Sequence, residues 1–359
     1  ELYSSNVLIM EKCADLLPDY YNFVRGVVDS SDITLNISRE TLQQTRQLQA
    51  MARRIEKKVT SELESMRDED REAYEKFFSN FGRGLKYGIY SSYGTKKDEL
   101  GDLLLFWSAR EGKMVTLAEY AKAMPEGQDK VYYAAGDDRD RLAKMPVVKS
   151  VLDHGYDVLL CTEDVDEFCF QAMHDYLAHG LPKSYADDAA REAAQKAVED
   201  GAEPEVEDRS LELRNVSSGD LDLASDEEKA EAEEATKANE GLFEAMKDAL
   251  GEKVGKVCVS TRLAGDDAPA TISSEGPLSL GMEKVLSAGP ESGEAPKAIR
   301  VLEVNAKHPV FSKLTAAQQA GDAEKVALYA QLLYSQALLV EGMMPEDPVA
   351  FASQVCELM

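Results

Sequence analysis

The stretches VYYAAG (residues 131–136) and YDVLLC (156–161) decide the fold class of this chain. Both are continuous apolar runs of strand length, and the first ends at Gly136. Residues 139–152, between them, follow a helical pattern. Buried parallel strands alternate with helices in this way, so the pattern predicts a small parallel sheet covered by helices, an αβα unit.

The residues before this unit are expected to form a region of their own. Residues 21–28 (YNFVRGVV) look like an apolar strand, and a polar loop follows them. Apolar residues then recur mostly at steps of three and four from Leu42 to Met66, which predicts an amphipathic helix of about seven turns. Two further helices are expected at 69–90 and 96–109.

The middle of the chain is strongly acidic. Residues 186–240 contain 19 acidic and six basic residues. Large apolar residues are scarce there except in SLELRNV (210–216), which we interpret as a lone strand. This composition favours a solvated linker or helical insertion. We therefore expect three regions: 1–110, then 111–225 with an acidic insertion at about 177–208, and finally 226–359.

The third region has an α+β pattern, so the whole chain is expected to be an α+β and α/β multidomain protein. Its helical patterns fall at 241–251 and 277–289, and its alternating, strand-like patterns at 256–263, 268–274 and 297–305. Two helices, at 322–342 and 348–358, are expected to close the chain. Asp347 followed by Pro348 is a typical start for the last one, a capping carboxylate before a proline at the first helical position.

Composition excludes several classes of function. A net charge of −27 argues against nucleic acid as a partner. No apolar run approaches the roughly 18 residues that a membrane span needs.

The five cysteines are widely spaced without a C-x-x-C pair, which suits buried residues in a reducing cytoplasm. The four histidines show no metal-ligand spacing, so no metal site is predicted, and the common phosphate-loop and nucleophile-elbow motifs are absent.

One loop carries a candidate for chemistry. In YNFVRGVVDSSDITLNISRETLQQ (21–44), Arg39 stands at the entrance of the long helix. A guanidinium beside free helical N–H groups is suited to binding a phosphate. The residues also allow Arg39 to pair with a nearby carboxylate, and on physical grounds this second interpretation is favoured.

The same segment resembles a known family. FVRGVVDSSDITLNISRETLQQ (23–44) is similar to the catalytic loop in the middle domain of the 90-kDa heat-shock protein chaperones, and LIMEKCADLLPDYYNF (8–23) to the run before it. Later landmarks also match: FGRGLKYGI, LLLFWSAR, VYYAAG, TEDVDEF, KVCVSTRL and the tail LLYSQALLVEGMMPEDPVAFASQV. The resemblance covers most of the chain outside 177–208 and favours the bacterial form. It implies the end of a large middle subdomain, a small αβα subdomain and a C-terminal dimerisation domain.

The resemblance implies a divided ATPase site. By analogy, Arg39 reaches the γ-phosphate of ATP held by an N-terminal nucleotide-binding domain, Gln43 assists, and Asn36 lies in the same loop. That domain and the first strands of the large middle subdomain are not in this sequence. We therefore expect ATP and Mg²⁺ to be cofactors of the full-length parent, and this fragment alone to bind neither and not to hydrolyse ATP.

The resemblance also implies a surface for non-native client proteins. Leu278, Met282 and Val285 fall at i, i+4 and i+7 of the helix expected at 277–289, so they share one face. In the family this helix offers apolar residues to clients, and a flexible methionine suits varied partners. The alternative, that the three residues pack on the domain's own sheet, is equally weighted.

The final helices predict a homodimer. Their apolar stripes are wider than one domain needs to cover, so pairing with a second copy in a four-helix bundle is expected. The predicted interface residues are Val326, Tyr329, Leu333, Ala337, Phe351, Val355 and Leu358. The function predicted is therefore a dimeric cytoplasmic chaperone that acts on unfolded clients. A dimeric interaction scaffold without ATPase coupling is the alternative, and a stand-alone metabolic enzyme has almost no motif support.

Overall fold

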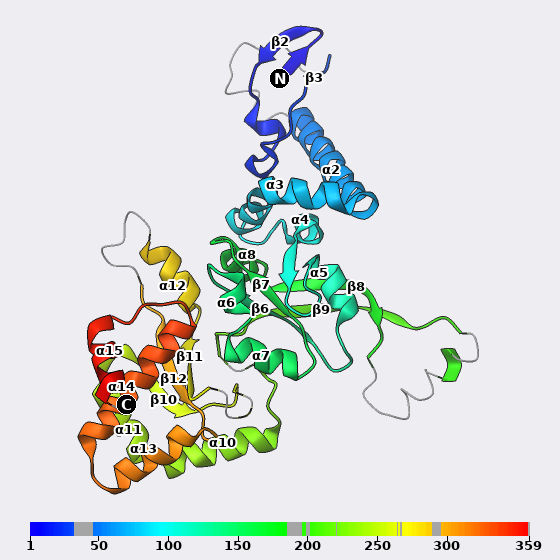
Figure 1. The fold of residues 1–359 in the computed structure, drawn as a ribbon. Helices are drawn as coiled ribbons and strands as arrows, with labels where there is room; N and C mark the ends of the chain where they lie inside the picture. The colour runs from blue at the N-terminus through cyan, green and yellow to red at the C-terminus, as the bar shows by residue number, and fades with distance from the viewer. Residues whose placement is uncertain are drawn as a thin grey trace.

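The computed structural model describes residues 1–31, 46–184, 196–198, 202–219, 221–263, 265, 268–288 and 296–357. A six-stranded sheet lies at its centre, with strand order β5-β4-β7-β6-β9-β8 (Figure 1). The strands are β4 (Phe106–Ser108), β5 (Met114–Val115), β6 (Lys130–Ala135), β7 (Val158–Cys161), β8 (Asp175–Pro182) and β9 (Val206–Asn215). Tyr132 lies opposite Val158 in parallel register, so the predicted pairing of the two deciding stretches is confirmed.

Two predictions about this sheet are wrong. The segment interpreted as a lone strand is the end of β9, which pairs in parallel with β6 and antiparallel with β8. The helix expected at 96–109 is instead the short helix α4 (Lys97–Leu100), a 3₁₀ turn (Gly101–Leu103) and β4. Phe106 is 2% exposed because β4 lies between β5 and β7 in the sheet. Pairing with distant strands, which local pattern does not reveal, decided both segments.

Helices cover both faces of the sheet. One side carries α5 (Leu117–Ala123), α8 (Asp166–Met173) and the long helices α2 (Arg46–Glu69) and α3 (Arg71–Ser91), whose apolar residues share one core with β6 and β7. The other side carries α6 (Arg139–Leu142) and α7 (Pro146–Asp153). The single helix expected at 139–152 is thus divided into two. Pro146 opens α7, because proline lacks the N–H that a continuous helix would use there.

A second, smaller sheet lies at the N-terminal end, with order β2-β1-β3. Its strands are β1 (Leu2–Ser4), β2 (Val7–Met10) and β3 (Val28–Asp29). The strand predicted at 21–28 is mostly wrong, since only Val28 belongs to β3. Residues Asp19–Tyr21 form a 3₁₀ turn that buries Tyr21 completely against the helices. The turn buries the rings of Tyr20 and Tyr21, which an extended backbone was expected to carry from Tyr21 onward.

The C-terminal unit contains a three-stranded sheet of order β10-β12-β11. Its elements are α10 (Asp226–Ala238), α11 (Glu240–Leu250), β10 (Lys256–Val259), β11 (Ala270–Glu275), α12 (Leu280–Ser287), β12 (Ile299–Val304), α13 (Pro309–Gln319), α14 (Ala323–Val340) and α15 (Pro348–Glu357). The predicted order of elements is confirmed, apart from α13, which the sequence reading missed, and α10, which lies in the acidic stretch interpreted as a linker or helical insertion. Asp347 Oδ1 accepts hydrogen bonds from the backbone N–H groups of Val349 and Ala350, so the predicted cap of α15 is confirmed.

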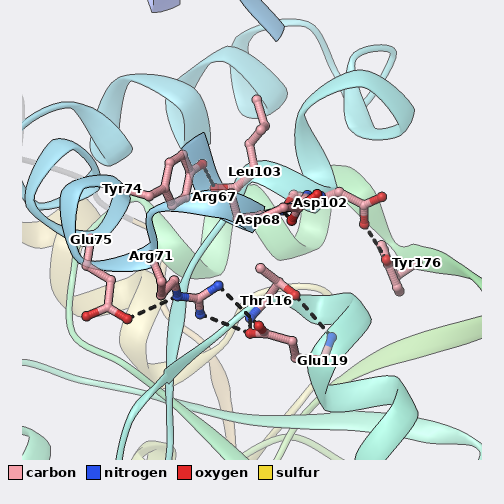
Figure 2. A network of polar contacts seen from close by, with 10 residues as sticks. All are labelled: Arg67, Asp68, Arg71, Tyr74, Glu75, Asp102, Leu103, Thr116, Glu119 and Tyr176. Carbon is pink, nitrogen blue, oxygen red and sulfur yellow. Dashed lines mark hydrogen bonds and ion pairs between the residues drawn. The ribbon is translucent and has the colours of Figure 1, made fainter. Parts of the chain in front are cut away.

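A polar network fastens the long helices to the central sheet (Figure 2). Arg67 of α2 donates from Nη1 to the backbone oxygen of Asp102, over 2.7 Å. Tyr74 of α3 donates to the backbone oxygen of Leu103. Arg71 at the start of α3 pairs with Glu119 of α5, 2.9 Å from its Oε2. Glu119 also completes the capping box of α5, and Arg71 Nη2 donates to the backbone oxygen of Met114 in β5, so α3, α5 and the sheet are tied at one place.

A buried ion pair lies beneath α3. Lys86 is 3% exposed, and its Nζ lies 2.5 Å from Asp166 and 2.7 Å from Glu163. It also lies over the ring of Phe106, 4.8 Å from the centroid. Desolvation opposes the charged form of Lys86, but the two carboxylates outweigh it and raise the pKa of the amine.

Replacing Lys86 is expected to destabilise the chain strongly. Lys86→Met leaves Asp166, which is 1% exposed, without its cation, and we expect a loss of about 3–5 kcal/mol in the free energy of unfolding. Denaturant titration measures this loss. Adding Asp166→Asn removes the unpaired charge and should recover part of the stability. A single variant as stable as the wild type would contradict the buried pair.

In the part of the chain that the structure describes, no helix is both long enough and apolar enough to span a membrane.

Candidate functional site

The predicted phosphate-binding loop, with Asn36, Arg39 and Gln43, lies outside the described residues. The helix that follows the loop is described. It is 24 residues long, about 36 Å from end to end, and Leu48 near its start is buried. Near its middle, Thr60 Oγ1 lies 2.6 Å from the Tyr21 hydroxyl. The helix packs on α3 and on the 3₁₀ turn Ala14–Leu16.

The predicted client helix, α12, begins at the junction of the middle and C-terminal units (Figure 1). Ser279 caps it by accepting a 3.0 Å hydrogen bond from the backbone N–H of Met282. Gln171 of α8 donates from Nε2 to the backbone oxygen of Pro277, just before the helix. On the opposite side, Lys284 lies 2.8 Å from Asp137. The helix is therefore held by the middle unit at both ends.

Glu167 of α8 is the centre of this attachment. The residue is 5% exposed, and its Oε1 accepts a hydrogen bond from Asn215 Nδ2 at the end of β9. Burial raises the pKa of its carboxyl, and hydrogen bonds from Ser279 and Asn215 oppose that rise. A Cβ built on Gly281 would lie 2.6 Å from Glu167 Oε2. A side chain at position 281 would therefore displace this carboxylate from the first turn of α12.

A methyl group at position 281 is expected to loosen α12. Gly281→Ala forces the buried Glu167 side chain to move, and we expect a loss of about 1–3 kcal/mol of stability, with faster amide hydrogen exchange in α12. Gly241→Ala is the matched control: it too lies in a helix, and its nearest neighbour would be 3.8 Å away. Alanine there should be neutral or stabilising. Equal exchange in α12 for both variants would contradict this account.

The three predicted client residues do not lie on one open face. Met282 is only 7% exposed, whereas Leu278 and Val285 are half-buried, with Leu278 packed against the C-terminal core. Leu286, which the sequence reading missed, is 39% exposed. The burial of the Met282 side chain argues against an open client-binding position for this residue. The apolar surface at α12 consists of Val285 and Leu286, with the half-buried Leu278 just before the helix.

The stripe predicted as the dimer interface covers the chain's own core. Val326, Leu333 and Ala337 of α14 are at most 4% exposed, and Tyr329 is 8% exposed. All four side chains pack in one cluster with the C-terminal sheet β10-β12-β11 and with α11, so they are not available to a partner. The physical reason is that α11, β11 and α13 cover this face of α14, which the helical periodicity alone does not reveal. Leu358 lies outside the described residues.

The opposite face of α14 and helix α15 remain apolar and partly open. Leu339 is 39% exposed, and Leu328 and Leu332, which share its face, are half-buried. On α15, Val355 is 38% exposed and Phe351 is half-buried. No residue of α15 is fully buried. These five residues, Leu328, Leu332, Leu339, Phe351 and Val355, are called the outer apolar row below.

The comparison with known families decides the identity of the fold. A family model described as Hsp90 protein matches residues 1–209 and 204–359, which together span the whole chain. The chain belongs to the Hsp90 family.

Curated relatives agree with this assignment. The proteins named "Chaperone protein HtpG" from Clostridium perfringens (strain ATCC 13124), Oceanobacillus iheyensis and Bacillus subtilis (strain 168) are 49%, 46% and 44% identical to it. Each match covers 100% of this chain and 51% or 52% of the relative. The chain thus spans about half the length of the curated relatives it matches. The expected resemblance to the bacterial form is confirmed.

A second buried carboxylate lies at the same junction of this Hsp90 chain. Glu341, at the end of α14, is partly exposed as a residue, but its Oε1 is buried without a hydrogen-bond partner in the described structure. Its Oε2 accepts a 3.0 Å hydrogen bond from Ser217, which follows β9. Burial raises the pKa of Glu341 to about 7, although Ser217, Arg262 and Arg141 favour the charged form and Glu167 opposes it.

The pKa of Glu341 gives a pH dependence with a definite sign. The folded state holds its proton up to about pH 7, whereas an unfolded glutamate loses it near its ordinary value of 4.5. Stability therefore falls as the pH rises through this window. We expect Glu341→Gln to change little at pH 4 and to stabilise by roughly 2–3 kcal/mol at pH 8, in paired denaturant titrations. Glu324→Gln, at the exposed start of α14, should be neutral at both pH values. Equal effects of the two substitutions would refute the assignment.

Proposed function

We propose that this chain is the middle and C-terminal part of a homodimeric bacterial chaperone that binds non-native client proteins. Its membership of the Hsp90 family supports this, together with relatives that are named as chaperones. The single structural observation that carries the proposal is α12. This helix presents Val285 and Leu286 at the surface, with the half-buried Leu278 just before it, and a polar contact to α8 holds its start.

The client surface is assigned to α12 for a physical reason. An exposed apolar row normally costs solubility, so a soluble chain that fixes such a row at a junction between two units has a use for it. Unfolded polypeptides expose apolar side chains of varied shape, and a short, partly open helix can contact them without requiring one sequence. Membership of the family agrees with this use but does not by itself assign the residues.

Dimerisation is assigned to the outer apolar row rather than to the stripe first predicted. Two copies would pack α14 and α15 about a two-fold axis and bury Leu339 and Val355. A dimer of this kind places two copies of α12 in one molecule. An extended client then makes two contacts, which strengthens binding without any new type of contact.

The ATPase role is assigned to the segment before α2. In the full-length protein, Arg39 would contact the γ-phosphate of ATP bound to the N-terminal domain, with Asn36 and Gln43 in the same loop. Its positive charge would stabilise negative charge that develops on the transferring phosphoryl group. Helix α2 would connect that loop to the turn before β4 through Arg67, which contacts the backbone oxygen of Asp102.

The client assignment is tested with the full-length protein. Leu286→Ser combined with Val285→Ser should weaken suppression of the aggregation of a heat-denatured protein by at least about fivefold, since two apolar contacts are lost. Lys247→Ser, on α11, is the control for a change on another helix of the same unit. Unchanged suppression by the double variant, with an unchanged melting temperature, would refute the assignment to α12.

A further inference from the structure

A cavity lies on the middle unit, away from α12. It has a volume of about 530 Å³ and opens between the N-terminal 3₁₀ turns, α2 and α3. Tyr20, Glu56 and Lys96 line it, and so do Asp15, Asp19 and Tyr87, which are exposed. Neither the proposed client helix nor the proposed ATPase loop uses any of these residues.

Tyr20, Glu56 and Lys96 form a fixed wall of the cavity. A Cβ on Gly88 would lie 2.6 Å from the ring of Tyr20, so the ring packs directly on the backbone of α3. The hydroxyl of Tyr20 donates to Glu56, and Lys96 Nζ lies 2.8 Å from the same carboxylate. Lys96 also pairs with Glu99 at 2.8 Å. A wall held by these contacts is preorganised for a ligand.

The cavity carries a net negative charge. The charge of Lys96 is balanced by Glu56 and Glu99. Asp15 and Asp19 are both exposed and make no ion pair within the described part of the chain. A cationic group entering the cavity therefore meets two carboxylates that have no charged partner among the described residues. The net charge of −27 on the whole chain draws cations in the same direction.

A row of aromatic rings leads away from the cavity. Tyr87 is 54% exposed and its ring centroid lies 6.0 Å from that of Tyr90, which is 42% exposed. The ring of Tyr90 lies 5.5 Å from that of Phe168 on α8. The next turn of α8 contains Gln171, which holds the start of α12. The row thus connects the cavity with the proposed client helix.

We propose that this cavity and the row Tyr87–Tyr90–Phe168 bind an extended client segment in which a lysine or arginine side chain lies close to aromatic residues. The inference rests on the proposed chaperone function and names the chemistry of the clients. The cation enters the cavity beside Asp15 and Asp19, and the aromatic side chains of the client pack on the tyrosine rings. Exposed tyrosines attract both groups, through stacking and through the negative face of the ring.

The preference for cationic and aromatic groups distinguishes the cavity and its tyrosine row from the surface of α12. The α12 row consists of aliphatic side chains and prefers no charge, whereas the cavity selects for a positive one. A client that is rich in basic and aromatic residues would contact both places. An acidic client would be limited to α12, because like charges repel at the cavity.

The test uses the full-length protein and short fluorescein-labelled peptides. In the first peptide, arginine and phenylalanine alternate with serine and glycine. Glutamine replaces arginine in the second, and glutamate replaces it in the third. Fluorescence anisotropy should give the tightest binding for the arginine peptide and the weakest for the glutamate peptide. Tyr87→Ser with Tyr90→Ser should weaken binding of the arginine peptide by about tenfold.

A charge variant and a matched aromatic control complete the test. Asp15→Asn with Asp19→Asn should weaken the arginine peptide severalfold and leave the glutamine peptide unchanged. Phe81→Ser is the control, because Phe81 is 40% exposed on the same helix but packs beside Phe77 and Phe23. It should bind all the peptides as the wild type does.

The outcomes separate this inference from the proposed function. If the wild type suppresses client aggregation but the tyrosine and aspartate variants bind the arginine peptide unchanged, the cavity is not a client site and the chaperone proposal stands. If the wild type neither suppresses aggregation nor binds any of the peptides, both are overturned. Equal affinity of the wild type for the arginine and glutamate peptides also overturns the inference.

Discussion

Replacing Arg39 by alanine in the full-length protein is expected to lower ATP turnover by at least about tenfold and leave ATP affinity nearly unchanged. One charge contact made in the transition state is typically worth about 2.7–4 kcal/mol, and its loss appears in kcat. Binding changes little, because the N-terminal domain would hold the nucleotide itself. Steady-state ATPase assays together with nucleotide titrations measure the two quantities separately.

The control for Arg39 lies on the adjoining helix. Arg53 is exposed on α2, and Arg53→Ala removes the same charge from the same unit without touching the proposed loop. It should leave turnover at the wild-type level. Turnover of Arg39→Ala equal to that of the wild type would refute the assigned role. An equal decrease in both variants would indicate a general effect of charge rather than contact with phosphate.

Introducing charge into the outer apolar row is expected to convert the chain from a dimer to a folded monomer. Leu339→Glu combined with Val355→Glu places two carboxylates on each copy at the proposed interface, where they would be buried without cations. Both side chains are more than a third exposed in the single chain, so the monomer keeps its core. Sedimentation velocity at micromolar concentration, with circular dichroism, measures mass and folding together.

Leu333→Glu is the contrasting variant. Leu333 is 4% exposed inside the C-terminal core, so a glutamate there is expected to unfold this unit, at a cost of about 4 kcal/mol or more. Ser312→Glu, on α13, should leave both mass and folding unchanged. A wild-type chain that is already monomeric, or a double variant that stays dimeric, would refute the outer row as the interface.

Local sequence was sufficient for elements whose determinants lie within a few residues. The cap of α15 depends on Asp347 and Pro348, which are adjacent. The end of α11 depends on Gly251, whose φ of 60° few other residues adopt. The parallel pair β6 and β7 was predictable because both strands are buried on two faces and therefore read as continuous apolar runs.

Predictions failed where distant segments decided the outcome. SLELRNV was interpreted as a lone strand because its neighbours in sequence are acidic, but its partners, β6 and β8, come from earlier in the chain. The apolar stripe of α14 was assigned to a partner because periodicity shows that a face is buried but not against what. The roles of Glu167 and Glu341 had no local signal at all, since acidic residues are abundant throughout the sequence.

The sequence by itself therefore determined the fold class, the order of most elements and, through FVRGVVDSSDITLNISRETLQQ and the later landmarks, the family. Only the tertiary structure decided which side chains remain available for binding. It buried Met282 and Leu333 in the chain's own core and left Leu286, Leu339 and Tyr87 open. The physical reason is that hydrophobicity is a property of each residue, whereas exposure depends on which distant elements pack against it.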